Sequence, residues 1–357
     1  MPNSSSVSTV QSKVRLFQTD RVWQEIGPEV LDLVNQAHSR GQAQNGDLTR
    51  QLEQELAERY SRKFCITTAC ATDALDIALQ ALNLAPGSRI AVPNYTFTAT
   101  AHAVVRAGHV PVVVDVTDNY CIDANSIPDV DAVMPVDLFG NMCEHKSLLS
   151  LGVPVVVDAA QSLESKDHDG VASPGHGTLS CVSFSPSKTI SSWGSGGAVL
   201  TDDPVLADCC RRLRLHGKQS NGDLAIAPGL NSMMSSAECA AVLVGLKRSS
   251  KWQARRKAIA DYVIGQSQYA AAVDSLPQHT LSKLVFQAQD RARVVDQLTQ
   301  LNIETAVHYQ RLISDEQIYH ISQSFLNSSR LRSISFTVPN QHTLTDHEVE
   351  LIAKGLQ

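Results

Sequence analysis

Apolar and polar positions along the chain follow two different periods. Over residues 28–38 and 48–60 the apolar side chains recur at helical spacing, which predicts two helices. Pro28 suits the first position of the first helix, and Gly41 lies just past its end. From residue 64 to 201, short apolar runs rich in β-branched residues alternate with further helical stretches. Runs that are apolar on both faces and separated by helices predict a mostly parallel sheet covered on both sides.

The alternating region contains about seven strand-like runs, judged by their length and β-branched content. They are residues 64–67, 90–92, 110–115, 132–136, 153–158, 181–184 and 198–201. Helices are expected between them at residues 72–82 and 98–107. The sequence therefore predicts an α/β fold with a mostly parallel, seven-stranded sheet.

After residue 202 the pattern changes. A helix is expected over residues 204–215, and a long helical stretch over 233–262, interrupted or bent near Gly245. Short strands at 284–287 and 334–338 and helices at 292–301 and 346–355 then predict a smaller α+β domain. We expect an N-terminal segment and helix over residues 1–45, a large domain over 46–245 and a small C-terminal domain over 246–357.

Composition narrows the function classes. The 357 residues carry a net charge of -6, so neither a nucleic acid nor an anionic membrane is expected as a partner. No apolar stretch approaches 18 residues, and the polar, Ser-rich residues 1–14 do not form a signal peptide. The eight Cys form no C-x-x-C pair and no zinc-spaced cluster with His, so no metal is expected. They are typical of reduced core thiols in a cytoplasmic protein.

Three reactive side chains stand at the ends of predicted strands. Thr72 follows the strand 64–67 and opens a helix, Asp158 ends the strand 153–158, and Lys188 follows the strand 181–184. In an open α/β sheet, ligands bind beyond the carboxyl ends of the strands. We therefore expect these side chains to share one site.

Each of the three side chains also has an ordinary structural explanation that involves no ligand. The start of a helix at Thr72 can hold a phosphate through free amide groups, or be an ordinary N-cap. A carboxylate such as Asp158 after Val-Val-Val needs a partner, for example a protonated pyridinium nitrogen, but it can also cap a helix. Lys188 can lose its proton by desolvation and form an imine, although most lysines lie on the surface. The order and spacing of the three side chains together support the prediction that they share one site.

These segments resemble the DegT/StrS family of nucleotide-sugar aminotransferases, which depend on pyridoxal 5'-phosphate (PLP). The resemblance extends from about residue 22 to 355. The segments that carry it are Thr68–Leu75, Pro86–Pro93, Thr96-Phe97, Gly108–Asp115, Leu138–Gly140, Asp158–Gln161, Ser183–Lys188, Gly229–Asn231 and His308-Tyr309.

The resemblance implies a role for each matching residue. Lys188 would form a Schiff base with PLP and move the proton in both halves of the reaction. The remaining cofactor contacts would be Ala71, Thr72 and Ser183 at the phosphate, Phe97 stacked on the ring, Asp158 at the ring nitrogen, Gln161 at the ring hydroxyl, and Asn231 reaching the phosphate in a neighbouring subunit. His308 and Tyr309 are candidate substrate contacts.

The resemblance also implies an aspartate-aminotransferase type of fold (PLP fold type I) and a homodimer with shared active sites. An amino donor, usually glutamate, would load the cofactor, and a keto group on a nucleotide-linked sugar would receive the amine. Such products serve cell-surface polysaccharides or glycosylated metabolites. By the same resemblance, the longer spacing from Lys188 to Gly196-Gly197 is associated with enzymes that aminate position 3 of the sugar.

Three positions depart from the family pattern. Ala71 replaces a common Gly, Ser195 stands where Glu or Asp is usual, and Met233 stands where Arg often follows the Asn. They bear on substrate contacts more than on PLP binding. Two alternatives stay open on the same fold: a PLP-dependent sugar dehydratase, which we expect to lack the lysine, and a non-catalytic PLP-binding regulator.

Overall fold

The computed structural model describes residues 13–218 and 224–357. The first helices are α1 (Thr19–Ser39) and α2 (Asp47–Arg59). The expected start of α1 at Pro28 is wrong, because the helix begins at Thr19 and Pro28 lies inside it. Pro28 is exposed and removes one backbone hydrogen bond, while its neighbours Ile26 and Gly27 are buried where α1 packs against α7. Packing therefore outweighs the local preference of proline.

The strands of the large part form two hydrogen-bonded sheets. One has the order β1-β7-β6-β5 and the other the order β3-β2-β4. The strands of these sheets are β1 (Phe64–Thr68), β2 (Arg89–Pro93), β3 (Val110–Val114), β4 (Ala132–Val133), β5 (Val156–Asp158), β6 (Leu179–Ser183) and β7 (Gly197–Thr201). Isolated parallel bridges, Val133 with Val155 and Val136 with Asp158, connect the two sheets at β4 and β5.

The prediction of one mostly parallel, seven-stranded sheet is wrong in two respects. The sheet is divided, and its four-stranded part is mixed, because β7 runs antiparallel to both β1 and β6. A parallel connection needs a crossover, usually a helix. Residues 184–196, which join β6 to β7, contain no helix, so β7 returns beside β6 in the opposite direction.

Helices cover both faces of the strands, as the apolar runs predicted. Alternate residues of β1 belong to different cores, with Cys65 on the side of α2 and α7 and Ile66 on the side of α3 and α4. The helices of this part, in addition to α1 and α2, are α3 (Ala71–Ala81), α4 (Ala99–Arg106), α5 (His145–Leu149) and α6 (Pro204–Arg214). Short 3₁₀ helices lie at η1 (Ala124–Ser126), η2 (Ser173–Gly175), η3 (Ile313–Asp315) and η4 (Gln317–Tyr319).

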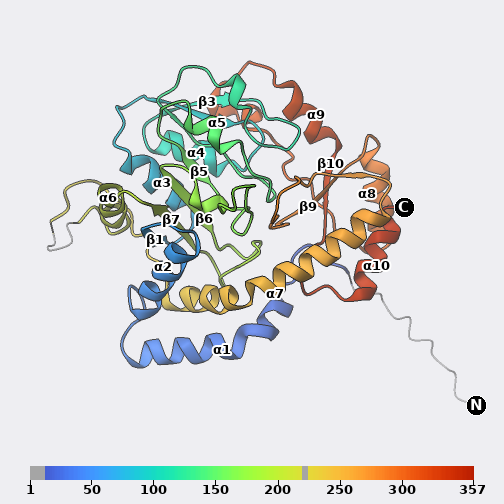
Figure 1. The fold of residues 1–357 in the computed structure, drawn as a ribbon, viewed down its shortest axis with the longest axis horizontal. Helices are drawn as coiled ribbons and strands as arrows, with labels where there is room; N and C mark the ends of the chain where they lie inside the picture. Colours follow the sequence, from blue (N-terminus) through green and yellow to red (C-terminus); the bar gives the residue numbers. More distant parts are fainter. Residues whose placement is uncertain (1–12, 219–223) are drawn as a thin grey trace, which may run out of the picture.

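A single long helix, α7 (Ser236–Gln266), links the large part to the C-terminal part (Figure 1). The expected interruption near Gly245 is absent from this helix. A Cβ at Gly245 would lie 3.2 Å from Ile190 and 3.4 Å from Trp252, so the glycine allows close packing. The expected division between residues 245 and 246 falls inside α7 and stays a proposal.

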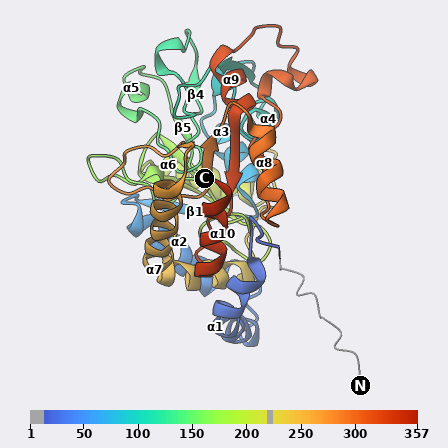
Figure 2. The same ribbon diagram turned by 90° about the vertical axis from the view of Figure 1, so that its right-hand side faces the viewer.

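The C-terminal part is a small α+β unit (Figure 2). Its antiparallel sheet has the order β10-β9-β8. Its elements are β8 (Ala270–Ala271), β9 (Leu284–Gln287), α8 (Arg291–Gln300), α9 (Leu326–Ile334), β10 (Ser335–Val338) and α10 (Asp346–Gly355). Val14, from the start of the described chain, packs into the same core. Among the described residues, no helix combines the length and apolar character needed to cross a membrane.

Candidate active site

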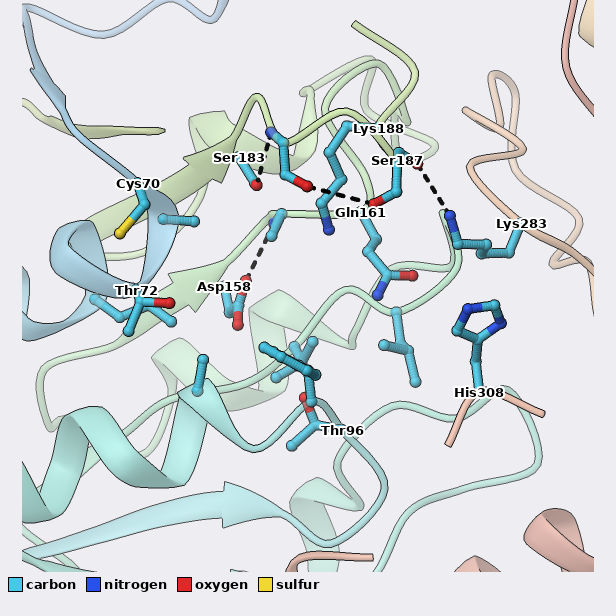
Figure 3. A pocket seen from close by; sticks show the side chains of 18 of the residues that line it. Cys70, Thr72, Thr96, Asp158, Gln161, Ser183, Ser187, Lys188, Lys283 and His308 are labelled. Carbon is cyan, nitrogen blue, oxygen red and sulfur yellow. Dashed lines mark hydrogen bonds between the residues drawn. The ribbon is translucent and has the colours of Figure 1, made fainter. Parts of the chain in front are cut away.

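A cavity of about 420 Å³ lies where the carboxyl ends of β5 and β6 meet the start of α3 and the C-terminal part (Figure 3). Every site residue predicted from the sequence lines this cavity except Asn231. Those lining it are Ala71, Thr72, Phe97, Asp158, Gln161, Ser183, Lys188, His308 and Tyr309. The fold therefore brings together residues that are up to 238 positions apart in the chain, from Ala71 to Tyr309.

The start of α3 forms one end of the cavity. Cys70 is the N-cap, and its Sγ accepts the N–H of Asp73 at 3.4 Å. The first amides of a helix have no intrahelical acceptor, which leaves those of Ala71 and Thr72 available to an anion. The Ser183 hydroxyl, at the end of β6, lines the same cavity. This end has the donors that a phosphate needs.

Gly197 holds this end closely against the sheet. A Cβ at Gly197 would lie 2.6 Å from the Ala71 nitrogen and 2.7 Å from the Cys70 carbonyl carbon. Real Cβ atoms do not approach backbone so closely, so only glycine allows β7 to pass the start of α3 here. The double glycine noted in the sequence thus has a steric reason at its second position.

Asp158 lies on the floor of the cavity at the end of β5. Its carboxylate accepts hydrogen bonds from Thr100 Oγ1 at 3.0 Å and from the Ala160 N–H at 3.1 Å. Within the described chain, no basic group lies within 4.0 Å of it. Burial raises the pKa of Asp158 above its usual value, although the charge of Lys188 opposes this. A cationic ring nitrogen would supply the missing partner.

Lys188 faces the cavity from the loop after β6. Its backbone N–H donates to Ser185 O at 2.9 Å, while its side-chain amine makes no hydrogen bond to the described residues. Burial lowers the pKa of Lys188 to about 8, and the charge of Asp158 partly opposes that shift. More of this amine is therefore uncharged near neutral pH than in an ordinary lysine, and the uncharged form is the one that attacks a carbonyl.

Gln161, Phe97 and Tyr309 form one wall. Gln161 Nε2 donates to the Tyr309 hydroxyl at 2.8 Å, and Gln161 Oε1 accepts the N–H of Phe139 at 3.2 Å. The rings of Phe97 and Tyr309 have centroids 5.7 Å apart. Burial raises the pKa of Tyr309, so its hydroxyl stays protonated. Together these side chains offer an aromatic surface next to polar donors.

His308 and Asn231 differ in their placement. The ring nitrogen Nδ1 of His308 lies 2.9 Å from Thr337 Oγ1. Burial and the charges of Lys283 and Lys188 lower the pKa of His308 to about 4, so the imidazole is neutral. Asn231 is exposed, pairs with Leu215 in an antiparallel bridge, and does not line the cavity. Its predicted role in a neighbouring subunit stays a prediction.

The sequence analysis missed Lys283, which lines the cavity just before β9. Its Nζ donates to Ser187 O at 3.0 Å and lies 4.6 Å from the centre of the Phe17 ring. A lysine inside the run Leu281–Phe286, which is otherwise mostly apolar, was the available signal. Phe17 was missed because the sequence pattern predicted no helix or strand before residue 28.

A second group of reactive side chains lies apart from this cavity. The ligand atoms of Cys121, Asp137 and Cys143 all lie within 4.8 Å of one another and are buried. Asp137 already accepts hydrogen bonds from the Cys143 N–H, from Ser173 Oγ and, at 2.9 Å, from His145. Because its carboxylate is satisfied by protein donors, we assign this group a structural role.

Comparison with known proteins agrees with the resemblance found in the sequence. The profile of the DegT/DnrJ/EryC1/StrS aminotransferase family matches residues 24–357. The chain is 32% identical over 283 residues to the UDP-2-acetamido-2-deoxy-3-oxo-D-glucuronate aminotransferase of Pseudomonas aeruginosa, covering 75% of this chain and 78% of that protein.

Two further similarities extend this result. The chain is 30% identical over 285 residues to the UDP-N-acetyl-3-dehydro-alpha-D-glucosamine 3-aminotransferase of Acidithiobacillus ferrooxidans, covering 74% of this chain and 75% of that protein. A crystal structure of a DegT DnrJ EryC1 StrS aminotransferase from Brucella abortus superposes with a TM-score of 0.91 at 23% identity. It covers 96% of this chain and 98% of that one. The structural match supports the fold.

Proposed function

Because the chain belongs to the DegT/DnrJ/EryC1/StrS aminotransferase family, we propose that it moves an amino group from an amino acid, with glutamate as the first donor to test, to a keto group of a nucleotide-linked sugar. The observation that carries the proposal is the Lys188 amine, which makes no hydrogen bond to the described residues and lies in a cavity lined by the start of α3 and by Asp158.

The family depends on PLP, and the cavity fits this cofactor. The amides at the start of α3 and the Ser183 hydroxyl can hold its phosphate, and the buried carboxylate of Asp158 can pair with a protonated ring nitrogen. Phe97 can cover the ring, and Gln161 can reach the ring hydroxyl. When bound, PLP supplies an electron sink for the carbon that loses a proton.

The side chains of this protein supply the proton transfers. Lys188 Nζ, with a pKa of about 8, can accept a proton as the amine and return it as the ammonium within the ordinary pH range. Asp158 stays buried under the cavity, where Thr100 and Ala160 fix its orientation. His308, being neutral, can donate or accept a hydrogen bond without adding charge.

The acceptor is proposed to be a 3-keto sugar. The relatives from P. aeruginosa and A. ferrooxidans are both named for UDP-linked sugars with a keto group at position 3. The longer spacing from Lys188 to Gly196-Gly197 favours the same position. The amino sugar would be made in the cytoplasm. It would then enter cell-surface polysaccharides or glycosylated metabolites.

The working unit is proposed to be a homodimer of the aspartate-aminotransferase type, with Asn231 contributed to the neighbouring cavity. Asn231 is exposed and lies outside its own cavity, as this arrangement requires. An exposed apolar groove supports the binding of a second copy of the chain. Trp23 and Trp193 line this groove, each is 39% exposed, and their rings meet edge to face with centroids 4.5 Å apart.

The test is a pair of half reactions with the purified, PLP-loaded protein. L-Glutamate is expected to change the cofactor absorbance and to yield 2-oxoglutarate, and an accepted keto sugar is expected to reverse that change. A panel of 3-keto and 4-keto nucleotide sugars, with products identified by mass, then gives the acceptor. No absorbance change with glutamate, glutamine or any other amino acid would contradict the proposal, and ammonia release from a sugar would favour a dehydratase.

A further inference from the structure

Lys283 is a second lysine in the same cavity, and the reaction proposed above gives it no role. Its side chain is buried, with 7% of the residue exposed. The polar contact of its Nζ is one backbone carbonyl, Ser187 O at 3.0 Å, and the Phe17 ring lies 4.6 Å away. No carboxylate among the described residues lies within 4.0 Å of this amine. Among the described residues, this buried amine therefore has no counter-charge for its protonated form.

The position of Lys283 separates it from the phosphate end of the cavity. Figure 3 shows Cys70 and Thr72 on one side of Lys188, and Lys283 with His308 on the other. An anion bound at Lys283 is therefore a different group from an anion bound at the start of α3. The cavity has two places for negative charge, with the reactive amine between them.

The surroundings of Lys283 make an anionic ligand favourable. Burial, together with the positive charges of Lys188 and Arg256, lowers the pKa of Lys283 well below its usual value. Burying an unpaired ammonium costs free energy that a bound carboxylate would return. His308, which is neutral, does not compete for that carboxylate with a charge of its own.

Anchoring the loop at Ser187 does not require a charge. A neutral donor such as an amide could make one hydrogen bond to a backbone carbonyl without the cost of desolvating an ammonium. A charged group at this place is explained by a charged partner that arrives with the ligand.

We propose that Lys283 is a specificity-determining residue that binds a carboxylate of a substrate inside the cavity. The inference rests on the proposed aminotransferase function. The carboxylate has two sources: the α-carboxylate of the amino donor, or an acidic group on the sugar. The two half reactions separate these sources, because each contains only one of the two substrates.

The experiment compares Lys283→Gln, Lys283→Arg and the wild type, all loaded with PLP. Lys251→Gln is the matched control, since it removes the same charge from an 82%-exposed side chain on α7. If Lys283 binds the carboxylate of the amino donor, Lys283→Gln raises the half-saturating L-glutamate concentration at least about tenfold, with a smaller change in the maximal rate. Lys283→Arg recovers most of this loss, and Lys251→Gln behaves as the wild type.

A binding measurement makes the test independent of turnover. Glutarate has carboxylates but no amino group, so it cannot react, and its affinity for each protein can be measured by calorimetry. Weaker glutarate binding in Lys283→Gln by the same factor supports the donor as the source. A loss confined to the half reaction with an acidic keto sugar, and absent with a neutral one, assigns the carboxylate to the sugar.

The outcomes that overturn the inference differ from those that overturn the proposed function. Unchanged saturation by glutamate, glutarate and acidic sugars in a folded Lys283→Gln protein removes the carboxylate role while leaving the aminotransferase function intact. A fall in maximal rate with every substrate and no change in saturation would make Lys283 a support for the Ser187 loop instead. A wild type that reacts with no amino acid contradicts the proposed function itself.

Discussion

Burial sets the properties of the single side chains in this cavity. The pKa of Lys188 falls from 10.5 to about 8, so the reactive amine form predominates above about pH 8 and is protonated below it. Recombination of the apoprotein with PLP is therefore expected to accelerate with rising pH and to level off above about 8. Absorbance measured during rapid mixing between pH 6 and 10 checks this.

Asp158→Asn is the companion variant. The negative charge of Asp158 raises the pKa of Lys188, so its removal should move the midpoint of that pH profile downward. An upward move would contradict the attraction between Asp158 and Lys188, and a wild-type midpoint near the ordinary lysine value of about 10.4 would mean that Lys188 is solvated like a surface lysine.

Gly197→Ala tests the contact between β7 and the start of α3. The added Cβ would meet the Ala71 nitrogen at 2.6 Å, so the backbone proposed to offer amides to the phosphate must move. We expect PLP affinity to fall by about tenfold or more, because charged hydrogen bonds depend on donor position. Gly194→Ala is the control, since its Cβ would meet only a side-chain oxygen of Glu238 at 3.5 Å. Equal PLP affinities in the two variants would refute the steric argument.

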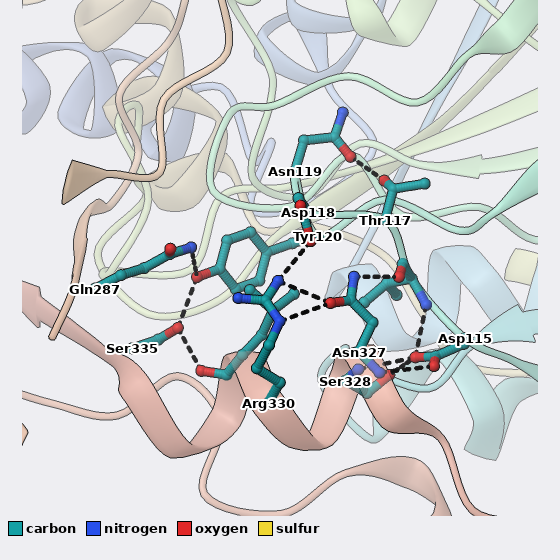
Figure 4. A network of polar contacts seen from close by, with 12 residues as sticks. Asp115, Thr117, Asp118, Asn119, Tyr120, Gln287, Asn327, Ser328, Arg330 and Ser335 are labelled. Atoms are coloured by element: carbon teal, nitrogen blue, oxygen red, sulfur yellow. Dashed lines mark hydrogen bonds and ion pairs between the residues drawn. The ribbon is translucent and has the colours of Figure 1, made fainter. Parts of the chain in front are cut away.

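At the level of elements, a carboxylate from the large part caps a helix of the C-terminal part. Asp115, just after β3, accepts hydrogen bonds from the N–H groups of Asn327 and Ser328 and from the Ser328 hydroxyl, at the start of α9 (Figure 4). Figure 4 also shows Asp118 paired with Arg330 on the same helix. The Asp118 side chain is 84% exposed. The two carboxylates thus form a natural comparison.

Asp115→Ala is expected to lower the free energy of unfolding by about 1–2 kcal/mol, because the first amides of α9 lose their acceptor. Asp118→Ala removes an exposed ion pair and should change it by no more than about 0.5 kcal/mol. Urea unfolding followed by circular dichroism measures both. A larger effect at Asp118 than at Asp115 would show that burial of the cap is unimportant.

The cap also predicts a pH dependence. Burial alone would raise the pKa of Asp115, but the hydrogen bonds from Ser328 and its neighbours outweigh it and hold the pKa below the usual value. The stabilisation is therefore present above the unfolded-state pKa of about 3.9 and is lost as the pH falls through the lower folded-state pKa. The difference in stability between the wild type and Asp115→Ala should be full at pH 7 and shrink below about pH 4.

Local sequence patterns predicted the elements better than their directions. The runs at 64–67 and 198–201 are strands, yet nothing in either run indicates that they lie side by side and antiparallel. Strand direction depends on the length and content of the connections, and the helix-free segment 184–196 was the informative one. Likewise, Pro28 was given too much weight, because the packing of its neighbours against α7 cannot be seen in the sequence.

The site was predictable where a motif adjoins a strand end. Lys188, Asp158 and Thr72 follow strands of one sheet, so their convergence follows from the α/β pattern. Lys283 could not be found in this way, since it comes from the C-terminal part and meets the cavity only through packing between the two parts. Asn231 stays a prediction because its proposed cavity belongs to another subunit.

For the whole molecule, the proposed homodimer with shared active sites predicts the behaviour of mixed dimers. We expect Lys188→Ala and Asn231→Asp proteins to be nearly inactive alone, the second through repulsion of the phosphate. A hybrid purified by two different affinity tags should recover about half of the wild-type activity, because one of its two cavities has both an intact Lys188 and an intact Asn231.

The control is the hybrid of Lys188→Ala with the wild type, which should have the same activity. An inactive hybrid of the two mutant chains would mean that Asn231 acts within its own subunit, and an active Asn231→Asp protein would mean that Asn231 has no role at the phosphate. A protein that stays monomeric at working concentrations would exclude shared sites altogether.

The antiparallel pairing of β1 with β7 has a consequence for the protein as it leaves the ribosome. β1 is made early but is an edge strand whose neighbour in the sheet is β7, and β7 follows only after more than half of the chain. At elongation rates of about 5–20 residues per second, β1 waits on the order of ten seconds with its backbone edge unpaired. The nascent chain therefore has a long interval in which this edge is open to incorrect pairing, and the cavity can form only after synthesis has passed Gly197.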